Sequence, residues 1–122
     1  MTPAEDAALL QTIVRRHLRT LELSLNASYP DEDWGFTAQQ AVEKILKASI
    51  VLRAQHPPRS HDLQELAELA GLEMPEELLD LQVFAIEARY QEGPFDLPAT
   101  KALLLEQIRI LLDACEQLIT PP

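Results

Sequence analysis

The chain has 122 residues, which is the length of one domain and enough to bury a hydrophobic core. Hydrophobic residues make up 47% of it and only three residues are glycine, which excludes an intrinsically disordered chain and a glycine-built phosphate loop. The formal net charge of −10 argues against a protein that coats nucleic acid, because affinity for phosphates comes mainly from lysine and arginine.

Leucine-rich segments with few β-branched runs and few turn signals predict an all-α fold. The first helix is predicted to begin with Thr2 as N-cap and Pro3 in its first turn, and to end before Tyr29. His17 lies at the edge of the apolar stripe of this helix, where a packed histidine is expected. The stripe itself consists of Leu10, Ile13, Val14, Leu18, Leu21 and Leu25.

An acidic loop with the sequence DEDWG, residues 31–35, is predicted to lead into a second helix with Thr37 as its N-cap. Pro57 and Pro58 end this helix. One broad face is apolar and contains Ala38, Ala41, Val42, Ile45, Ala48, Ser49 and Leu52. The opposite face is polar and carries Gln39, Gln40, Glu43, Lys44 and Lys47.

A short third helix is predicted to be capped by Ser60 and terminated by Gly71. Pro75 opens a fourth helix with two apolar stripes, one running from Leu78 to Ala88 and the other from Leu79 to Tyr90. A helix that is apolar on two sides lies between two layers, either inside a monomer or at a subunit contact. This double stripe, together with Val51 on the polar side of the second helix, predicts a homodimer.

The last helix is predicted to open at Pro98 and to have an apolar face from Leu104 to Ile119. Cys115, the single cysteine, falls on that face and is expected to be a buried small hydrophobe. About five helices with short connections predict a compact up-and-down antiparallel bundle that forms one domain over residues 1–122.

The sequence indicates no metal, no cofactor and no membrane segment. One cysteine and three scattered histidines do not suit a zinc site, and no Glu-x-x-His pair has the spacing of a di-iron bundle. The N-terminus carries Glu5 and Asp6 and lacks a basic leader, and no apolar run approaches the ~20 residues of a membrane span. The expected location is therefore the cytoplasm.

The polar face of the second helix and the turn after it form the candidate site. Between Thr37 and His61 four lysines and arginines stand against one glutamate, so this part of an acidic chain is cationic. One interpretation is that Lys44, Lys47, Arg59 and His61 converge on a phosphate at the start of the third helix, where an anion is favoured. The other is that Glu43 and Lys47 form only a helix-stabilising i,i+4 pair and His61 packs in the connection.

Three motifs carry a resemblance to a known family: FTAQQAVEKILKA at 36–48, PPRSHDL at 57–63, and ARY at 88–90 before a loop and the final helix. From roughly Leu18 onward their order and spacing resemble the HEPN domain family (higher eukaryotes and prokaryotes nucleotide-binding). The resemblance implies a helical bundle, usually a homodimer, often paired with a minimal nucleotidyltransferase from a neighbouring gene in a toxin–antitoxin module. The polar positions that it carries over are Gln40, Glu43, Lys44, Lys47, His61, Asp62, Arg89 and Tyr90.

One departure from the family pattern concerns catalysis. Ribonuclease members carry an arginine, four to six residues, and then a histidine. Here two residues separate Arg53 from His56 and seven separate it from His61, while a single residue separates Arg59 from His61. No pair fits, so we expect the branch without the ribonuclease motif and no catalytic residues.

Three hypotheses about function follow. The leading one is a non-catalytic HEPN homodimer that binds a nucleotide, or the nucleotidyltransferase that handles one; the acidic charge disfavours RNA. The second is a ribonuclease toxin with an atypical site that uses His61 with Arg53 or Arg59. The third is a purely structural oligomerisation module in which the polar face is only solvated.

Overall fold

The computed structural model describes residues 2–118, except for the side chains of residues 88 and 89. Within that range all regular elements are helical, as the sequence predicts. They are α1 (Pro3–Leu23), α2 (Asp31–Leu52), α3 (Leu63–Ala70), α4 (Glu76–Leu79), the 3-10 helix η1 (Asp80–Phe84), α5 (Glu87–Tyr90) and α6 (Lys101–Gln117). None of the helices described has the combination of length and hydropathy that crossing a bilayer requires.

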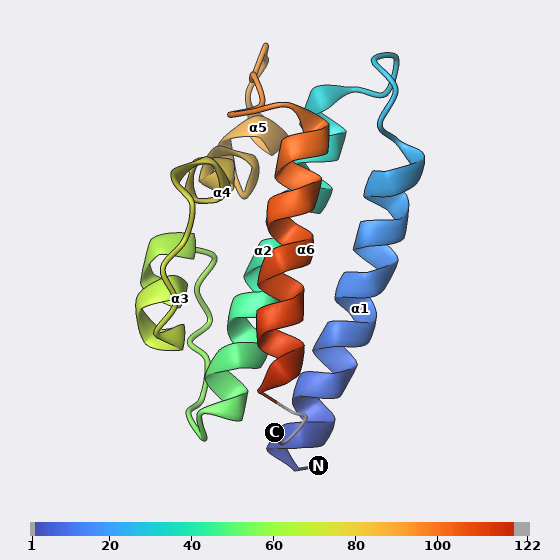
Figure 1. Ribbon diagram of the computed structural model, residues 1–122. Coiled ribbons are helices and arrows are strands. Elements are labelled where there is room, and N and C mark those ends of the chain that lie inside the picture. The colour runs from blue at the N-terminus through green and yellow to red at the C-terminus, as the bar shows by residue number, and fades with distance from the viewer. Residues whose placement is uncertain (1, 119–122) are drawn as a thin grey trace.

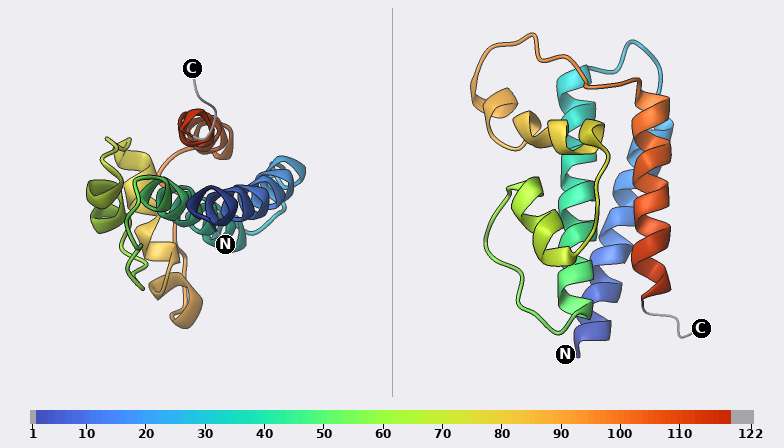
Figure 2. Two further views of the ribbon diagram at one scale, coloured as in Figure 1. Left: turned by 90° about the horizontal axis from the view of Figure 1, so that it is seen from below. Right: turned by 60° about the vertical axis from the view of Figure 1, so that its left-hand side comes forward.

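Helix α2 is the central element of the bundle. Helices α1 and α6 pack along one side of it, and α3, η1 and α5 cover another side (Figures 1 and 2). Helix α1 runs antiparallel to α2 and α6, and these two run in the same direction because the chain returns through the short helices (Figure 1). The chain thus returns from the end of α2 to the start of α6 through the short helices α3, α4, η1 and α5, and not through one long helix.

The start of α1 confirms the predicted cap, and its end corrects the predicted length. The Oγ1 of Thr2 accepts the N–H of Glu5 at 3.1 Å, and the Glu5 carboxylate accepts the N–H of Thr2 at 3.2 Å, which is a complete capping box. The helix stops at Leu23, so Leu25 is 44% exposed and lies outside the buried stripe. The reason is local, because Asn26 accepts the N–H of Ser28 and forms a turn that competes with the helix.

Helix α2 begins six residues before the predicted Thr37 cap. The segment DEDWG is its first turn, with three acids at the positive end of the helix dipole. Thr37 lies inside the helix, where its hydroxyl donates to the carbonyl of Asp33 at 3.2 Å. Gly35 is needed in this early part because a Cβ atom there would lie 2.6 Å from the ring of the buried Phe84. This glycine therefore lets η1 approach α2 closely.

The cap of α3 is Asp62 and not Ser60. The Asp62 carboxylate accepts the N–H groups of Gln64 and Glu65 at 3.0 and 3.2 Å, and the Ser60 hydroxyl accepts the N–H of Asp62 at 3.0 Å. A carboxylate is favoured at this position because it also interacts with the helix dipole. Gly71 ends the helix in the left-handed conformation, as predicted.

The predicted fourth helix is broken into α4, η1 and α5. The first predicted stripe is confirmed, because its described side chains are buried: Leu78, Leu81, Phe84 and Ala85. The side chain of its last member, Ala88, is not among those that the structure describes. The far end of the second stripe is exposed, at 55% for Ile86 and 75% for Tyr90. The 3-10 helix η1 packs on α2, and its Gln82 bonds the backbone of His61 and Leu63 at the end of the α2–α3 connection.

Helix α6 begins at Lys101 and is capped by Thr100. The prediction that this helix opens at Pro98 is therefore wrong. Leu104 to Cys115 supply its buried face, whereas Leu118 is exposed and Ile119 lies outside the described residues. Cys115 is buried as expected, and its Sγ accepts a hydrogen bond from Gln11 of α1 at 3.2 Å.

Candidate functional site

The middle of the polar face of α2 is buried and is not a solvated surface. Glu43 is only 4% exposed, and Gln39, one turn earlier, is fully buried. The α2–α3 connection crosses this face and brings His61 onto Glu43. The middle of the face is therefore the inside of a polar cluster, and only its rim reaches solvent.

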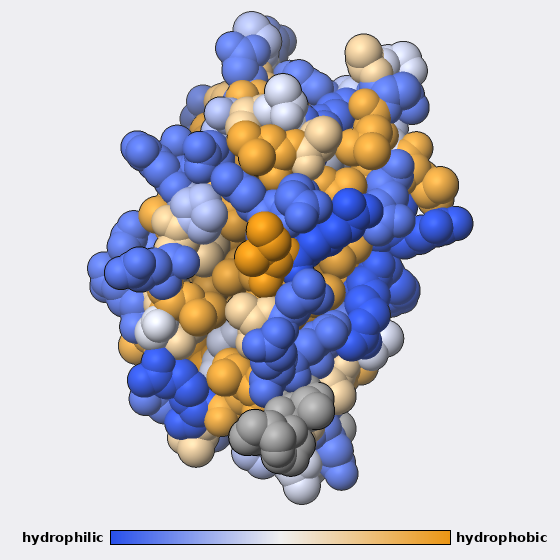
Figure 3. Space-filling view, in the orientation of Figure 1, coloured by the Kyte–Doolittle hydropathy of each residue, from blue (hydrophilic) through white to orange (hydrophobic). Residues whose placement is uncertain are grey.

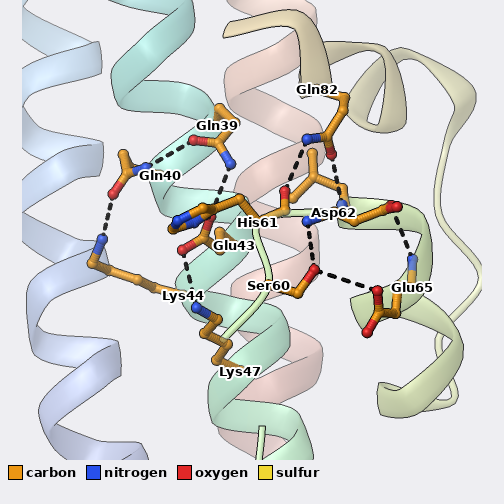
Figure 4. Close-up of polar contacts among 11 residues, drawn as sticks. Gln39, Gln40, Glu43, Lys44, Lys47, Ser60, His61, Asp62, Glu65 and Gln82 are labelled. Carbon is orange, nitrogen blue, oxygen red and sulfur yellow. Dashed lines mark hydrogen bonds and ion pairs between the residues drawn. The ribbon is translucent and has the colours of Figure 1, made fainter. Parts of the chain in front are cut away.

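Glu43 is the centre of this cluster, which we define as Gln39, Gln40, Glu43, Lys44, Lys47 and His61 and name the Glu43 cluster. One carboxylate oxygen lies 2.8 Å from Nδ1 of His61 and accepts from the amide of Gln39 at 3.0 Å. The other accepts from Nζ of Lys47 at 3.2 Å (Figure 4). Burial alone would raise the pKa of Glu43, but the hydrogen bonds from His61 and Gln39 and the charge of Lys47 outweigh it and lower the pKa.

The cluster continues along α2 to a second lysine. Gln40 donates to the amide oxygen of Gln39 at 2.8 Å, and Lys44 donates to the amide oxygen of Gln40 at 2.8 Å. Burial lowers the pKa of Lys44, the carboxylate of Glu43 opposes that shift, and the positive charge of Lys47 adds to it. Three i,i+4 bonds and the bond between the adjacent residues Gln39 and Gln40 thus form one continuous hydrogen-bonded chain on this helix face.

His61 is held from two sides. The backbone around it is fixed by Gln82 of η1, whose amide donates to the carbonyl of His61 at 2.9 Å and accepts the N–H of Leu63 at 2.6 Å (Figure 4). Gln82 is a residue that sequence reasoning missed. The only signal for it is one amide side chain within the apolar run from Leu81 to Phe84.

The orientation of His61 determines what it can do. A carboxylate only accepts, so Nδ1 carries the proton in the bond to Glu43, and Nε2 is the ring atom left for an external group. The side chain of His61 is 58% exposed, whereas that of Glu43 is 5% exposed. A buried carboxylate thus orients an accessible imidazole, which can exchange a proton or, when protonated, donate to a phosphate oxygen.

The start of α3 is already occupied by a carboxylate. Asp62 bonds the two backbone N–H groups that a phosphate would use there. A phosphate near this point would therefore be bound by side chains of the Glu43 cluster and not by the helix N-terminus.

The two arginines considered with His61 have different surroundings. The guanidinium of Arg53 donates to the carbonyl of Ala70 at 2.9 Å and lies against Gly71, so it caps the end of α3. Arg59 is exposed and forms no ion pair with any residue that the structure describes.

The remaining predicted residues lie in or beside α5. Tyr90 is exposed on α5, and the predicted role of Arg89 concerns a side chain outside the described residues. The structure therefore brings together Gln40, Glu43, Lys44, Lys47 and His61, with Asp62 beside them as a cap.

A histidine of α1 borders the cluster. Burial, the charge of Lys44 and the charge of Arg16 together lower the pKa of His17, in that order of importance. Its Nε2 is buried and has no hydrogen-bond partner among residues 2–118. His17 is thus the packed histidine that the sequence predicts, and it is a neutral neighbour of Lys44.

The described part of the chain contains no group of three histidine, cysteine, aspartate or glutamate side chains placed to hold a metal ion. The cluster offers ammonium, imidazole and amide donors around one carboxylate, which is a set suited to an anionic group with several oxygen atoms.

A model of the HEPN domain family matches residues 12–120, which include all of the Glu43 cluster. Comparison with curated proteins and with solved structures found no match. The family model covers most of the chain and spans the helices from α1 to α6. The chain belongs to the HEPN domain family.

Proposed function

We propose that this chain is a non-catalytic HEPN domain protein that binds the phosphate groups of a nucleotide at the rim of the Glu43 cluster. It acts as a homodimer with a minimal nucleotidyltransferase as partner, in a module of the toxin–antitoxin type. Membership in the family supports a nucleotide-related or ribonuclease-type function at the coarse level. The observation that carries the proposal is the buried carboxylate that holds Lys47 and His61 next to each other.

The balance of charge favours binding of an anion. Lys44 and Lys47 face one carboxylate, so the cluster keeps an excess positive charge within an acidic chain. Lys47 and His61 reach the surface in part, which makes their hydrogens available to phosphate oxygens. Hydrogen bonds between charged donors and phosphate are among the stronger ones in proteins.

The surroundings of Arg53 favour binding over cleavage. Cleavage of RNA by an arginine and a histidine requires both side chains to converge on one phosphate. Arg53 is engaged with the carbonyl of Ala70 at the far end of α3, so it does not accompany His61.

A thermal-unfolding screen against nucleoside mono-, di- and triphosphates tests the nucleotide half of the proposal. A ligand at a hundred times its dissociation constant stabilises the fold by ~2.7 kcal/mol, which raises the midpoint by several degrees in a small domain. We expect the shift in the wild type and in Arg19→Ala, which removes an exposed cation of α1, and not in Lys44→Ala/Lys47→Ala. Each shift is measured from the variant's own ligand-free midpoint.

If no nucleotide shifts the wild type, the cluster is structural and the chain is an oligomerisation or protein-binding module. A shift that survives in Lys44→Ala/Lys47→Ala would place the nucleotide elsewhere. Co-purification with the product of the neighbouring gene tests the partner, and a monomeric mass at micromolar concentration would contradict the homodimer.

A second candidate function rests on the contact between Glu43 and His61. A carboxylate that fixes an imidazole through Nδ1 and leaves Nε2 for substrate is the arrangement of a general base. An atypical ribonuclease would use this histidine with Arg59. It predicts growth arrest on expression that His61→Ala relieves, and equal growth of both strains rules it out.

A further inference from the structure

A groove of about 280 Å³ lies between α6 and the segment that connects α3 to α4. Residues of α6 with i, i+3, i+4 and i+7 spacing line it on one side, and Leu72 and Pro75 line it on the other. Figure 3 shows a hydrophobic patch near the middle of this view, with hydrophilic surface to its right and below it. The residues on α6 are Gln107, Ile110, Leu111 and Ala114.

The groove exposes apolar surface that the fold does not use. Ile110, one of the residues that line the groove, is 60% exposed. At the groove's edge, the amide of Gln107 donates to Glu77 at 3.3 Å, and its Oε1 has no hydrogen-bond partner within the described chain. Apolar surface that is rimmed by polar residues is a common feature of sites where another molecule binds.

The rim of the groove is acidic. Glu73 lines it, and the carboxylate of Glu77 contacts the groove residue Gln107. On α6, Glu106 and Asp113 lie one turn on either side of Ile110. Arg109, which precedes Ile110 on α6, is already paired with Glu22 of α1 at 3.0 Å.

We infer that this groove binds a cationic amphipathic helix of a partner protein. An apolar side chain of that helix packs beside Ile110, and its lysines or arginines lie over the acidic rim. Two turns of α6, about 10 Å at 1.5 Å per residue, match the i, i+3/i+4, i+7 anchors of a helix that lies in a groove. The groove shares no residue with the Glu43 cluster, so the inference stands apart from the nucleotide proposal.

Other occupants fit the groove less well. Nucleic acid and anionic membranes are repelled by the acidic rim. Small-molecule pockets usually have volumes of roughly 300–1,000 Å³, and this groove lies just below that range. A symmetric contact with a second copy would bring two acidic rims together, because a two-fold interface uses the same patch on both subunits.

Fluorescence anisotropy with a labelled leucine–lysine amphipathic helix as probe tests the inference. We expect saturable binding to the full chain, weakened about tenfold or more by Ile110→Lys, which places a like charge in the groove. Ile86→Lys is the matched control, because Ile86 is 55% exposed and lies outside the groove. Glu73→Lys is a second variant, at the rim of the groove, and is also expected to weaken binding of the cationic probe.

Three results would overturn the inference. The first is no saturable binding of the probe to the wild type. The second is equal weakening by Ile110→Lys and Ile86→Lys, which would mean that only net charge matters. The third is a dimeric wild type that becomes monomeric in Ile110→Lys, which would mean that a second copy covers the groove.

Discussion

Charged side chains occur in two contrasting settings in this bundle. In the Glu43 cluster, a carboxylate with a 5% exposed side chain accepts from three donors. Between α1 and α6, Arg15 pairs with Glu116 at 2.7 Å and Arg109 with Glu22 at 3.0 Å, and all four side chains are about a third to a half exposed. The distances are similar, so the difference in burial determines what each contact contributes.

Hydration explains why burial matters more than distance. An exposed pair exchanges its contact for water at little cost, whereas a buried carboxylate that loses its donors keeps an uncompensated desolvation penalty. The α1–α6 pairs therefore stabilise the helix arrangement slightly. The Glu43 cluster instead fixes the positions of Lys47 and His61, which is the property that a binding site requires.

The largest effect is expected for removal of the central carboxylate. Glu43→Ala leaves the side-chain N–H of the buried Gln39 without its acceptor and lets His61 and Lys47 turn to solvent, so it should cost about 2–3 kcal/mol of unfolding free energy. Glu22→Ala is the matched control, since it removes an ion-paired but more exposed glutamate. Equal losses of unfolding free energy in urea for the two variants would show that burial does not distinguish the two glutamates.

The Glu43 cluster is also expected to give the fold a dependence on acid. The pKa of Glu43 is lower in the folded chain than its ordinary value of 4.5, so the unfolded chain binds the proton more readily. The stabilisation is therefore present above about pH 4.5 and is lost as the pH falls through the folded-state pKa. Between pH 7 and pH 3, the urea midpoint should fall less steeply for Glu43→Gln than for the wild type. Parallel plots of midpoint against pH for the two proteins would contradict this.

His17 should add a smaller dependence at higher pH. Its pKa is lowered from 6.5, so protonation favours the unfolded chain and stability declines as the pH falls below about 6.5. An NMR titration should place its midpoint below 6.5, and Lys44→Met should raise that midpoint by removing a nearby positive charge. A wild-type midpoint at or above 6.5 would be inconsistent with the packing of His17.

The helices could be predicted where local chemistry determines them. The N-cap at Thr2, the left-handed end at Gly71 and the apolar face of α6 that carries Cys115 each follow from residues a few positions apart. The break between α4 and α5 depends instead on contacts of Phe84 with Gly35 and of Gln82 with the backbone near His61. Such contacts join segments that are distant in sequence, so the helical periodicity of a single segment does not predict them.

The residues that α2 contributes to the candidate site could be predicted from the sequence, but their burial could not. The polar spacing on α2 groups Gln40, Glu43, Lys44 and Lys47 correctly on one face, because that follows from helix geometry alone. What covers the face is the α2–α3 connection, which a helical wheel of α2 does not include. The burial of Glu43 and the orientation of His61 therefore appear only in three dimensions.

The smallest effect is expected for the exposed pair between α1 and α6. A double-mutant cycle on Glu22→Ala and Arg109→Ala should give a coupling of ~0.2–1 kcal/mol, reduced further by added salt, because water and ions screen both side chains. The comparable cycle on Glu43→Ala and Lys47→Ala should give a larger coupling that changes less with salt, since the Lys47 side chain is 19% exposed and Glu43 is more buried still. If the two couplings were equal and equally sensitive to salt, the Glu43 cluster would be behaving as a surface, and its role in holding His61 for a ligand would lose its physical basis.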